Sequence, residues 1–370
     1  MVFLGIDLHS NCFSCCFLHE DGSSDTKSFT ITPLELDDFY RHLTAETYVM
    51  IEASTNTFPF ADLIRSRVKQ VFIANPHKLK LISLVKRKTD KIDAEKLAIY
   101  LKMQIVSGEE LVKPVYVPDE TIRDLRSLFT TYRLLRRQTG STKNRIHSLL
   151  KQHLLPFTRE YIFGKARRRK IRAISQDDAL NFQLALLFDE LEYIEKRIAE
   201  VKDALYRMAA CYYKEIDILT SMKGISVLTA IALIADIATV TRFPHAKEFA
   251  SYLRSAPGVD ASNEIHRSLG TNKQGRKLSV TLLSQSLNHF RDGNPKIHKW
   301  YDKLVNKNRK RVGIVRMAIC RRVFTELYQM LKKGEYHWYR DKKNHTWKME
   351  QYRKFLQKYD LYKQGGTKSA

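Results

Sequence analysis

The 370-residue sequence contains no apolar run near the roughly 20 residues that a bilayer-spanning helix needs. Its longest apolar block, residues 226–235, suits a buried helix, and its N-terminus lacks the basic and apolar regions of a signal peptide. The five cysteines have no disulfide-framework spacing, and no second CxxC or histidine pair completes a zinc site. These absences predict reduced thiols in a cytoplasmic protein.

Acidic residues are also scarce relative to basic ones. The chain has 40 Asp and Glu against 64 Lys and Arg, which gives a formal net charge of +24. Such an excess predicts a polyanionic partner, and an anionic membrane surface competes with nucleic acid for that role. We expect nucleic acid as the partner and no membrane.

The first 118 residues alternate short apolar segments with segments of helical periodicity. The strands are predicted at 2–8, 12–18, 27–31, 47–53 and 70–74, and the helices at 32–43, 58–68 and 89–104. Three strands joined by short turns, followed by alternating helices and strands, predict an α/β domain with a mixed sheet over residues 1–118.

The remainder of the chain is predicted to be mostly helical. Residues 121–172 hold 15 Lys or Arg and only two acids, and one long helix is expected over 120–153. Residues 119–215 are predicted to form a basic helical spacer, residues 216–363 a helical C-terminal domain, and residues 364–370 a tail. Within the C-terminal domain we expect a polar loop at 256–277 and one helix at 278–290. The fold class is therefore α/β plus all-α.

A heptad pattern of apolar residues runs through the second half of the spacer. The seam consists of Leu184, Leu187, Leu191, Ile194, Ile198, Val201, Leu205 and Met208. Gaps that alternate between three and four residues are typical of a coiled coil. The seam can join two copies of the chain, as a dimer or tetramer, or pack against the helix at 120–153, and a helical hairpin can do both.

Four acids lie where a mixed sheet could gather metal ligands. Asp7 is on the first strand, Glu52 ends the fourth, and Asp90 and Asp93 begin a helix and project from one face of it. Carboxylates at such a site suit Mg²⁺ or Mn²⁺ and phosphoryl transfer. Alternatively, the two helical acids only favour the helix dipole, and Glu52 is solvated. His9 shares the strand face of Asp7, but we interpret it as a neighbour.

Basic residues near these acids and along the spacer are candidates for phosphate contacts. Each could instead belong to a solvated face. The candidates are Lys86, Arg87, Lys88, Arg133, Arg136, Arg137, Lys143, Arg145, Arg167, Arg168, Arg169, Lys273, Arg276 and Lys277.

The motifs "GIDLHS" (5–10), "VMIEAS" (49–54) and "KTDKIDAEKLA" (88–98), together with residues 222–277, resemble the DEDD transposases of the insertion-sequence one-ten family. The resemblance covers roughly residues 2–290. It implies an RNase H/RuvC-like catalytic domain with Asp7, Glu52, Asp90 and Asp93 around Mg²⁺. It also implies donor and target DNA as substrates, a structured guide RNA, and a bacterial or archaeal, nucleoid-associated protein.

The resemblance further implies a nucleophilic serine in the C-terminal domain that forms a covalent phosphoserine with DNA. Ser262 in "PGVDASNE" matches the position of that serine, and Ser268 is the fallback. The family usually has Gly after the serine, where this chain has Asn263. The sequence shows no histidine beside Ser262, so the acid site would have to activate the serine across the domain boundary or from another subunit.

Two other functions remain open from the sequence. A metal-dependent nuclease of the Holliday-junction type would use the acids without a covalent intermediate. A non-catalytic nucleic-acid-binding protein would need only the basic surface.

Overall fold

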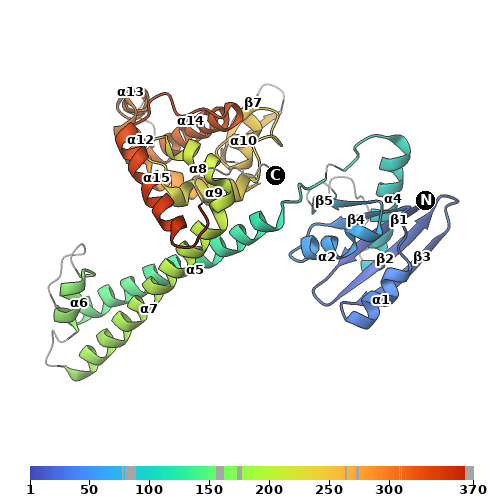
Figure 1. Ribbon diagram of the computed structural model, residues 1–370, viewed down its shortest axis with the longest axis horizontal. Helices are drawn as coiled ribbons and strands as arrows, with labels where there is room; N and C mark the ends of the chain where they lie inside the picture. The colour runs from blue at the N-terminus through green and yellow to red at the C-terminus, as the bar shows by residue number, and fades with distance from the viewer. Residues whose placement is uncertain are drawn as a thin grey trace. The chain divides into compact units, whose positions relative to one another are not determined.

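The computed structural model describes residues 1–76, 79, 89–112, 114–155, 162–172, 177–262, 265–271, 275–307, 309 and 311–362. The chain divides into two compact units, Met1–Pro118 and Asp119–Ala370. Figure 1 shows that the first unit combines a sheet with helices and that the second unit is mostly helical. The further division of the second unit into a spacer and a C-terminal domain stays a prediction. No helix in the described part is long and apolar enough to span a membrane.

The first unit is built on a five-stranded mixed sheet with the strand order β3-β2-β1-β4-β5. Strands β1, β2 and β3 form an antiparallel meander, and β4 and β5 run parallel to β1. The strands are β1 (Val2–Leu8), β2 (Cys12–His19), β3 (Ser24–Thr30), β4 (Thr47–Glu52) and β5 (Gln70–Ala74). This arrangement confirms the predicted mixed sheet of an RNase H/RuvC-like domain.

Helices cover both faces of this sheet. The helices are α1 (Pro33–Arg41), α2 (Thr57–Ile64), the short 3₁₀ helix η1 (Arg65–Arg67) and α4 (Asp90–Ser107). Leu4 and Ile6 of β1 point into a core with Phe39 of α1 and Phe60 of α2. The opposite side of β1 packs with Leu97 of α4. The alternation of side chains along β1 therefore assigns its even-numbered residues to α1 and α2, and its odd-numbered residues to α4.

The second unit begins with two long helices, α5 (Glu120–Gln152) and α7 (Asp178–Met208), which pack against each other within one chain. The short helix α6 (Lys165–Ile171) lies between them in sequence. Leu184 and Leu191 of the heptad seam are buried with Ile146 and Leu149 of α5. The seam therefore builds the predicted intramolecular hairpin. Its role in joining subunits stays a prediction.

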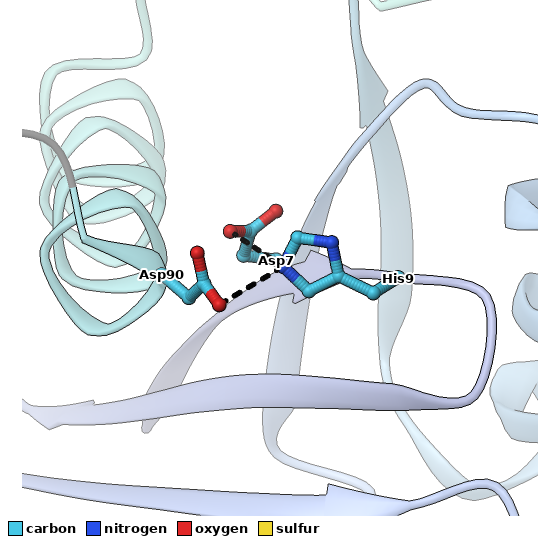
Figure 2. A group of neighbouring side chains, drawn as sticks. All are labelled: Asp7, His9 and Asp90. Atoms are coloured by element: carbon cyan, nitrogen blue, oxygen red, sulfur yellow. Dashed lines mark ion pairs between the residues drawn. The ribbon is translucent and has the colours of Figure 1, made fainter.

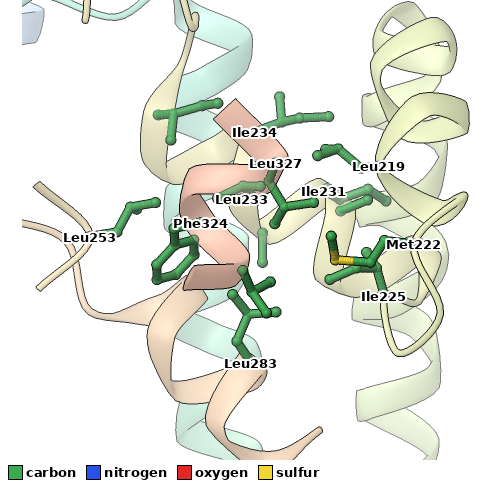
Figure 3. Close-up of a cluster of buried hydrophobic side chains, with 14 of the residues drawn as sticks. Leu219, Met222, Ile225, Ile231, Leu233, Ile234, Leu253, Leu283, Phe324 and Leu327 are labelled. Carbon is green, nitrogen blue, oxygen red and sulfur yellow. The ribbon is translucent and has the colours of Figure 1, made fainter. Parts of the chain in front are cut away.

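The rest of the second unit is a helical body around the apolar helix α9, and Figure 3 shows the side chains that pack there. All eleven residues of α9 except Leu228 are buried. The elements are η2 (Ala209–Tyr212), α8 (Tyr213–Thr220), α9 (Val227–Ile237), α10 (Ala246–Tyr252), β6 (Pro257–Ser262), β7 (Ile265–Thr271), α11 (Leu278–Gln285), α12 (Leu287–Gly293), α13 (Pro295–Asp302), η3 (Lys303–Lys307), α14 (Val312–Lys333) and α15 (Lys342–Gln357).

Two predictions about this body are wrong. The segment expected to be a polar loop contains an antiparallel hairpin of β6 and β7. The helix expected at 278–290 is interrupted at Ser286, so α11 and α12 are separate helices. Hydrophobic periodicity misses the hairpin because its apolar residues are few and its alternation is short. Val259 and Ala261 alternate with Asp260 and Ser262 in β6, and Ile265 and Leu269 are the large apolar residues in the sequence of β7.

Candidate active site

Asp7 lies at the end of the central strand on the face that α4 covers. Its side chain is 17% exposed, so it is reachable from solvent but sheltered. The parallel pairing of β1 with β4 runs as far as Ile6 and Ile51. Because neighbouring parallel strands keep their register, the next residues, Asp7 and Glu52, follow side by side on the same face. The carboxyl-terminal ends of β1 and β4 thus bring two predicted acids side by side.

Gly5 allows α4 to approach this face closely. A Cβ atom at Gly5 would lie 2.0 Å from the carbonyl oxygen of Ala94 and 2.5 Å from the backbone nitrogen of Ala98. Only a residue without a side chain fits there. Helix α4 begins directly after Thr89, whose hydroxyl accepts a hydrogen bond from the backbone N–H of Ile92. The helix therefore presents its first residue, Asp90, beside the end of β1.

Asp7, His9 and Asp90 converge at this point, as Figure 2 shows. The Nε2 atom of His9 lies 3.5 Å from Oδ2 of Asp7 and 3.2 Å from Oδ2 of Asp90. One potential ligand atom from each residue lies within 4.8 Å of the others. The side chains of His9 and Asp90 are 45% and 61% exposed, so the group is open to an incoming phosphate.

The structure gathers some of the predicted acids and adds one residue. Asp93 is part of α4, but its Oδ1 accepts a hydrogen bond of 3.0 Å from Nζ of Lys96. Within the described ranges, neither Asp93 nor Glu52 belongs to the close group around His9. Interpreting His9 as only a neighbour overlooks this group. Because His9 lies after the last residue of β1, the alternation of side chains along the strand does not fix its direction.

The chemistry of the group fits a divalent cation. Two carboxylates lie near each other with an imidazole nitrogen between them, where a positive charge would stabilise both. Oxygen ligands favour Mg²⁺, and an added imidazole nitrogen also suits Mn²⁺. Asp7 and Asp90 would hold such an ion, with His9 beside them.

The candidate nucleophile lies in the hairpin of the second unit. The backbone of Ser262 pairs with that of Ile265 at the end of β6, next to the turn, whereas Ser268 pairs with Val259 within β7. The pairing is irregular between Pro257 and Val259. The side chains of both serines are outside the part that the structure describes.

The predicted phosphate-binding residues differ in their surroundings. Lys86, Arg87, Lys88 and Lys273 lie outside the described residues. Those that are exposed on α5, on α6 or before α11 are Arg133, Arg136, Arg137, Arg145, Arg167, Arg169 and Lys277. Lys143 and Arg276 are partly buried.

Arg168 is a poor candidate for a phosphate contact. It is 7% exposed, and its Nη2 donates to both carboxylate oxygens of Glu195 at 2.8 Å. Because its donors are used within the chain, we leave it out of the proposed nucleic-acid surface.

Comparison with known proteins identifies the family. A DEDD IS110 model, described as transposase, matches residues 4–155, which include all four predicted acids. A second model, described as transposase of the IS116/IS110/IS902 family, matches residues 216–301, which include the hairpin. A search of curated proteins gave no match. The DEDD family implies dependence on a divalent metal ion. The two matches together span more than half of the chain, which therefore belongs to the IS110 family of transposases, enzymes that cut and rejoin DNA.

Proposed function

We propose that this transposase cuts and rejoins DNA by phosphoryl transfer that depends on Mg²⁺ or Mn²⁺ held by Asp7 and Asp90. The observation that carries the proposal is the convergence of Asp7, His9 and Asp90, with ligand atoms within 4.8 Å of one another. Glu52, the next residue on the neighbouring strand, and Asp93, one turn along α4, complete the acid set. The bound ion supplies positive charge that stabilises the transferring phosphoryl group.

The proposed nucleophile is Ser262. Its Oγ forms a bond to phosphorus while one phosphodiester P–O bond of the DNA breaks. The serine proton leaves to a base, and the departing sugar oxygen takes up a proton. In the second step, a sugar hydroxyl of another DNA end attacks the phosphoserine and restores both the phosphodiester and the free serine. One ester replaces another in each step, so rejoining needs no external energy source.

We also propose that a structured RNA binds the protein and directs it to its DNA, and that the active unit is a homo-oligomer. The resemblance to the family suggests both. The net charge of +24 and the exposed arginines of α5 support a large polyanionic surface, and RNA and DNA phosphates satisfy it equally. Purifying the protein from its host and sequencing the bound nucleic acid tests the RNA. One RNA encoded beside the gene supports guiding, whereas a random sample of host RNA refutes it.

The nucleophile is tested by trapping a covalent adduct. Purified protein is incubated with nicked DNA of the element's ends and Mg²⁺, then denatured and separated on a gel. We expect a protein–DNA adduct with wild type and with Ser268→Ala, and none with Ser262→Ala. An adduct that persists in Ser262→Ala would show that the assignment is wrong.

The acid site is tested separately with Asp7→Asn, which keeps the size of the side chain and removes its charge. We expect strand cleavage to fall by about 10²-fold or more, the usual loss for a group that stabilises charge in the transition state. Cleavage by Ser262→Ala without any adduct would instead favour the junction-type nuclease. In that case the acids hydrolyse DNA directly.

A further inference from the structure

A short loop between α14 and α15, residues 334–341, turns a histidine inward and three aromatic rings outward. His337 is only 4% exposed. The exposed fractions of Tyr336, Trp338 and Tyr339 are 46%, 57% and 46%. The ring centres of Trp338 and Tyr339 lie 5.5 Å apart. Tryptophan is usually well buried in folded proteins, and exposed rings that adjoin one another are typical of an interaction surface.

His337 holds this loop in place through its backbone and both of its ring nitrogens. Its backbone N–H donates to the hydroxyl of Ser221 at 2.9 Å. Its Nδ1 accepts from the backbone N–H of Tyr339 at 3.2 Å, so the ring proton lies on Nε2. Nε2 donates to Oε2 of Glu326 at 3.0 Å. Because the loop is already fixed, its outward rings need little further ordering when a ligand binds.

A second anchor ties the start of the loop to α8. The hydroxyl of Tyr336 donates to Oδ2 of Asp217 at 2.6 Å, and Nε2 of the buried His345 lies 2.9 Å from Oδ1 of the same carboxylate. The ring centres of Tyr336 and His345 lie 5.4 Å apart. The carboxylates of Asp217 and Glu326 therefore anchor the loop, and the rings that it exposes have a defined direction.

Cations lie on and around the exposed rings. Nζ of Lys296, at the start of α13, lies 4.3 Å from the centre of the Trp338 ring. The guanidinium of Arg340 lies 4.3 Å from the centre of the Tyr336 ring. Residues 332–348 contain six Lys or Arg against two acids. Four of these lysines are exposed: Lys332, Lys333, Lys342 and Lys343. Aromatic rings interleaved with positive charge match a ligand that carries flat bases and a regular row of phosphates.

We propose that Tyr336, Trp338 and Tyr339 form a stacking surface for unpaired bases of a nucleic-acid strand, with Lys296 binding an adjacent phosphate. A base inside a duplex has both faces covered by its neighbours, so the surface selects single strands. An enzyme that cuts and rejoins DNA transfers strands from one duplex to another, and this transfer exposes unpaired bases. DNA and RNA strands offer the same stacking faces and phosphates. The proposal depends neither on Ser262 nor on the acid group.

The first experiment measures how tightly the full-length protein binds short single strands. Fluorescent oligonucleotides of dT or U, about eight nucleotides long, are titrated at several NaCl concentrations. Trp338→Ala should raise Kd by about 5- to 150-fold, the usual loss for a stacked ring, and leave the slope of log Kd against log salt unchanged. Lys296→Gln should instead reduce that slope by about 0.7, as expected for one lost phosphate contact on a single strand.

Trp347→Ala is the matched control. Trp347 is 60% exposed on α15 and lies two residues after the buried His345, so it points to the opposite side of the helix from that anchor. Its replacement should leave Kd unchanged. A Kd of Trp338→Ala equal to that of wild type with both strands, or equal losses in the two variants, would overturn the proposal. A loss with only one strand assigns the surface to DNA or to RNA.

A second measurement observes the stacking directly. The chain has three tryptophans, so the double variant Trp300→Phe/Trp347→Phe leaves Trp338 as the only one. Stacking of a base should quench its fluorescence as the oligonucleotide binds, whereas inorganic phosphate should not. Binding without quenching would contradict the proposal. If Trp338→Ala changed the mass of the protein in light scattering but not its Kd, the surface would join two copies of the chain, which also contradicts the proposal.

Discussion

Replacing Gly5 by alanine should disable the acid group without touching any of its ligands. Gly5 lies two residues before Asp7 on the strand face that α4 covers. The added methyl group would lie 2.0 Å from the carbonyl oxygen of Ala94, whereas ordinary contacts begin at 3.4 Å. The helix must therefore move away from β1 by about 1.4 Å. Because the obstructing atoms belong to the backbone, no side-chain rotation can relieve the contact.

The size of the effect follows from this displacement. Overpacking of this kind costs about 1–3 kcal/mol, and the Tm of a domain of this size falls by roughly 4–8 °C for each kcal/mol. Asp90 begins α4 and moves with it. A ligand atom must lie within about 0.2 Å of its usual distance from the metal ion. A displacement of Asp90 several times larger should therefore weaken Mn²⁺ binding at least tenfold.

The assay compares Gly5→Ala with Gly140→Ala. Gly140 lies within α5 and has no other atom within 4 Å of a built Cβ, so alanine there should stabilise the helix by about 1 kcal/mol. Mn²⁺ affinity is measured by calorimetry, and Tm by circular dichroism. A Gly5→Ala protein with the Mn²⁺ affinity and Tm of wild type would refute the close approach of α4 and the metal site together.

Three further predictions follow from the packing and charges. Phe188→Ala, at a buried position between α5 and α7, should lower the free energy of unfolding, measured with urea, by about 3–5 kcal/mol. Phe182→Ala, at a position 65% exposed on α7, should lower it by less than about 0.5 kcal/mol. Similar losses in the two variants would contradict the packing of the hairpin. Burial raises the pKa of Asp217, but hydrogen bonds from His345 and Tyr336 outweigh this effect and lower the pKa overall. The ionised carboxyl of Asp217 therefore stabilises the fold at pH values above its unfolded pKa of about 4. This stabilisation is lost as the pH falls further, through the folded pKa. Asp217→Asn should therefore flatten the acid limb of a plot of stability against pH, and an unchanged limb would refute the assignment. Chelation of divalent ions should stop strand cleavage, and added Mg²⁺ or Mn²⁺ should restore it; cleavage in excess chelator would exclude the metal.

The strands of the first unit could be predicted because each carries a strong local signal. In β1, apolar residues fill both faces until Asp7 interrupts them, and this break shows where the strand meets solvent. The long helix at 120–153 matches α5 almost to the residue, since no Pro or Gly breaks it except the exposed Gly140. By contrast, His9 lies after the strand, where the chain direction is free, and only the folded turn brings it between Asp7 and Asp90.

The buried carboxylate of Asp236 shows a different limit of sequence reading. Asp236 looks like an ordinary polar residue near the end of an apolar helix, and its partners Ser279 and Arg276 lie about 40 residues away. No periodicity links positions so far apart, because the pairing is created by the packing of α9 with α11. Charge alone predicts that Arg276 binds nucleic acid. Its anchoring by a buried carboxylate could be found only from the fold.

The position of Asp7 follows from the topology of the sheet. In the order β3-β2-β1-β4-β5, β1 is central, so its end has β2 on one side, β4 on the other and α4 above. An acid at the end of an edge strand would have one neighbouring strand and fewer places for a second carboxylate. Asp7 instead lies beside the end of β4, which carries Glu52, and near the first residue of α4, Asp90. A carboxylate on this strand is thus the one around which the other ligands can gather, and its loss should be harder to compensate than the loss of Asp93, which already pairs with Lys96. Asp93→Asn should therefore reduce metal affinity less than Asp7→Asn, and the reverse order in a calorimetric titration would show that the ion lies closer to the second acid of α4.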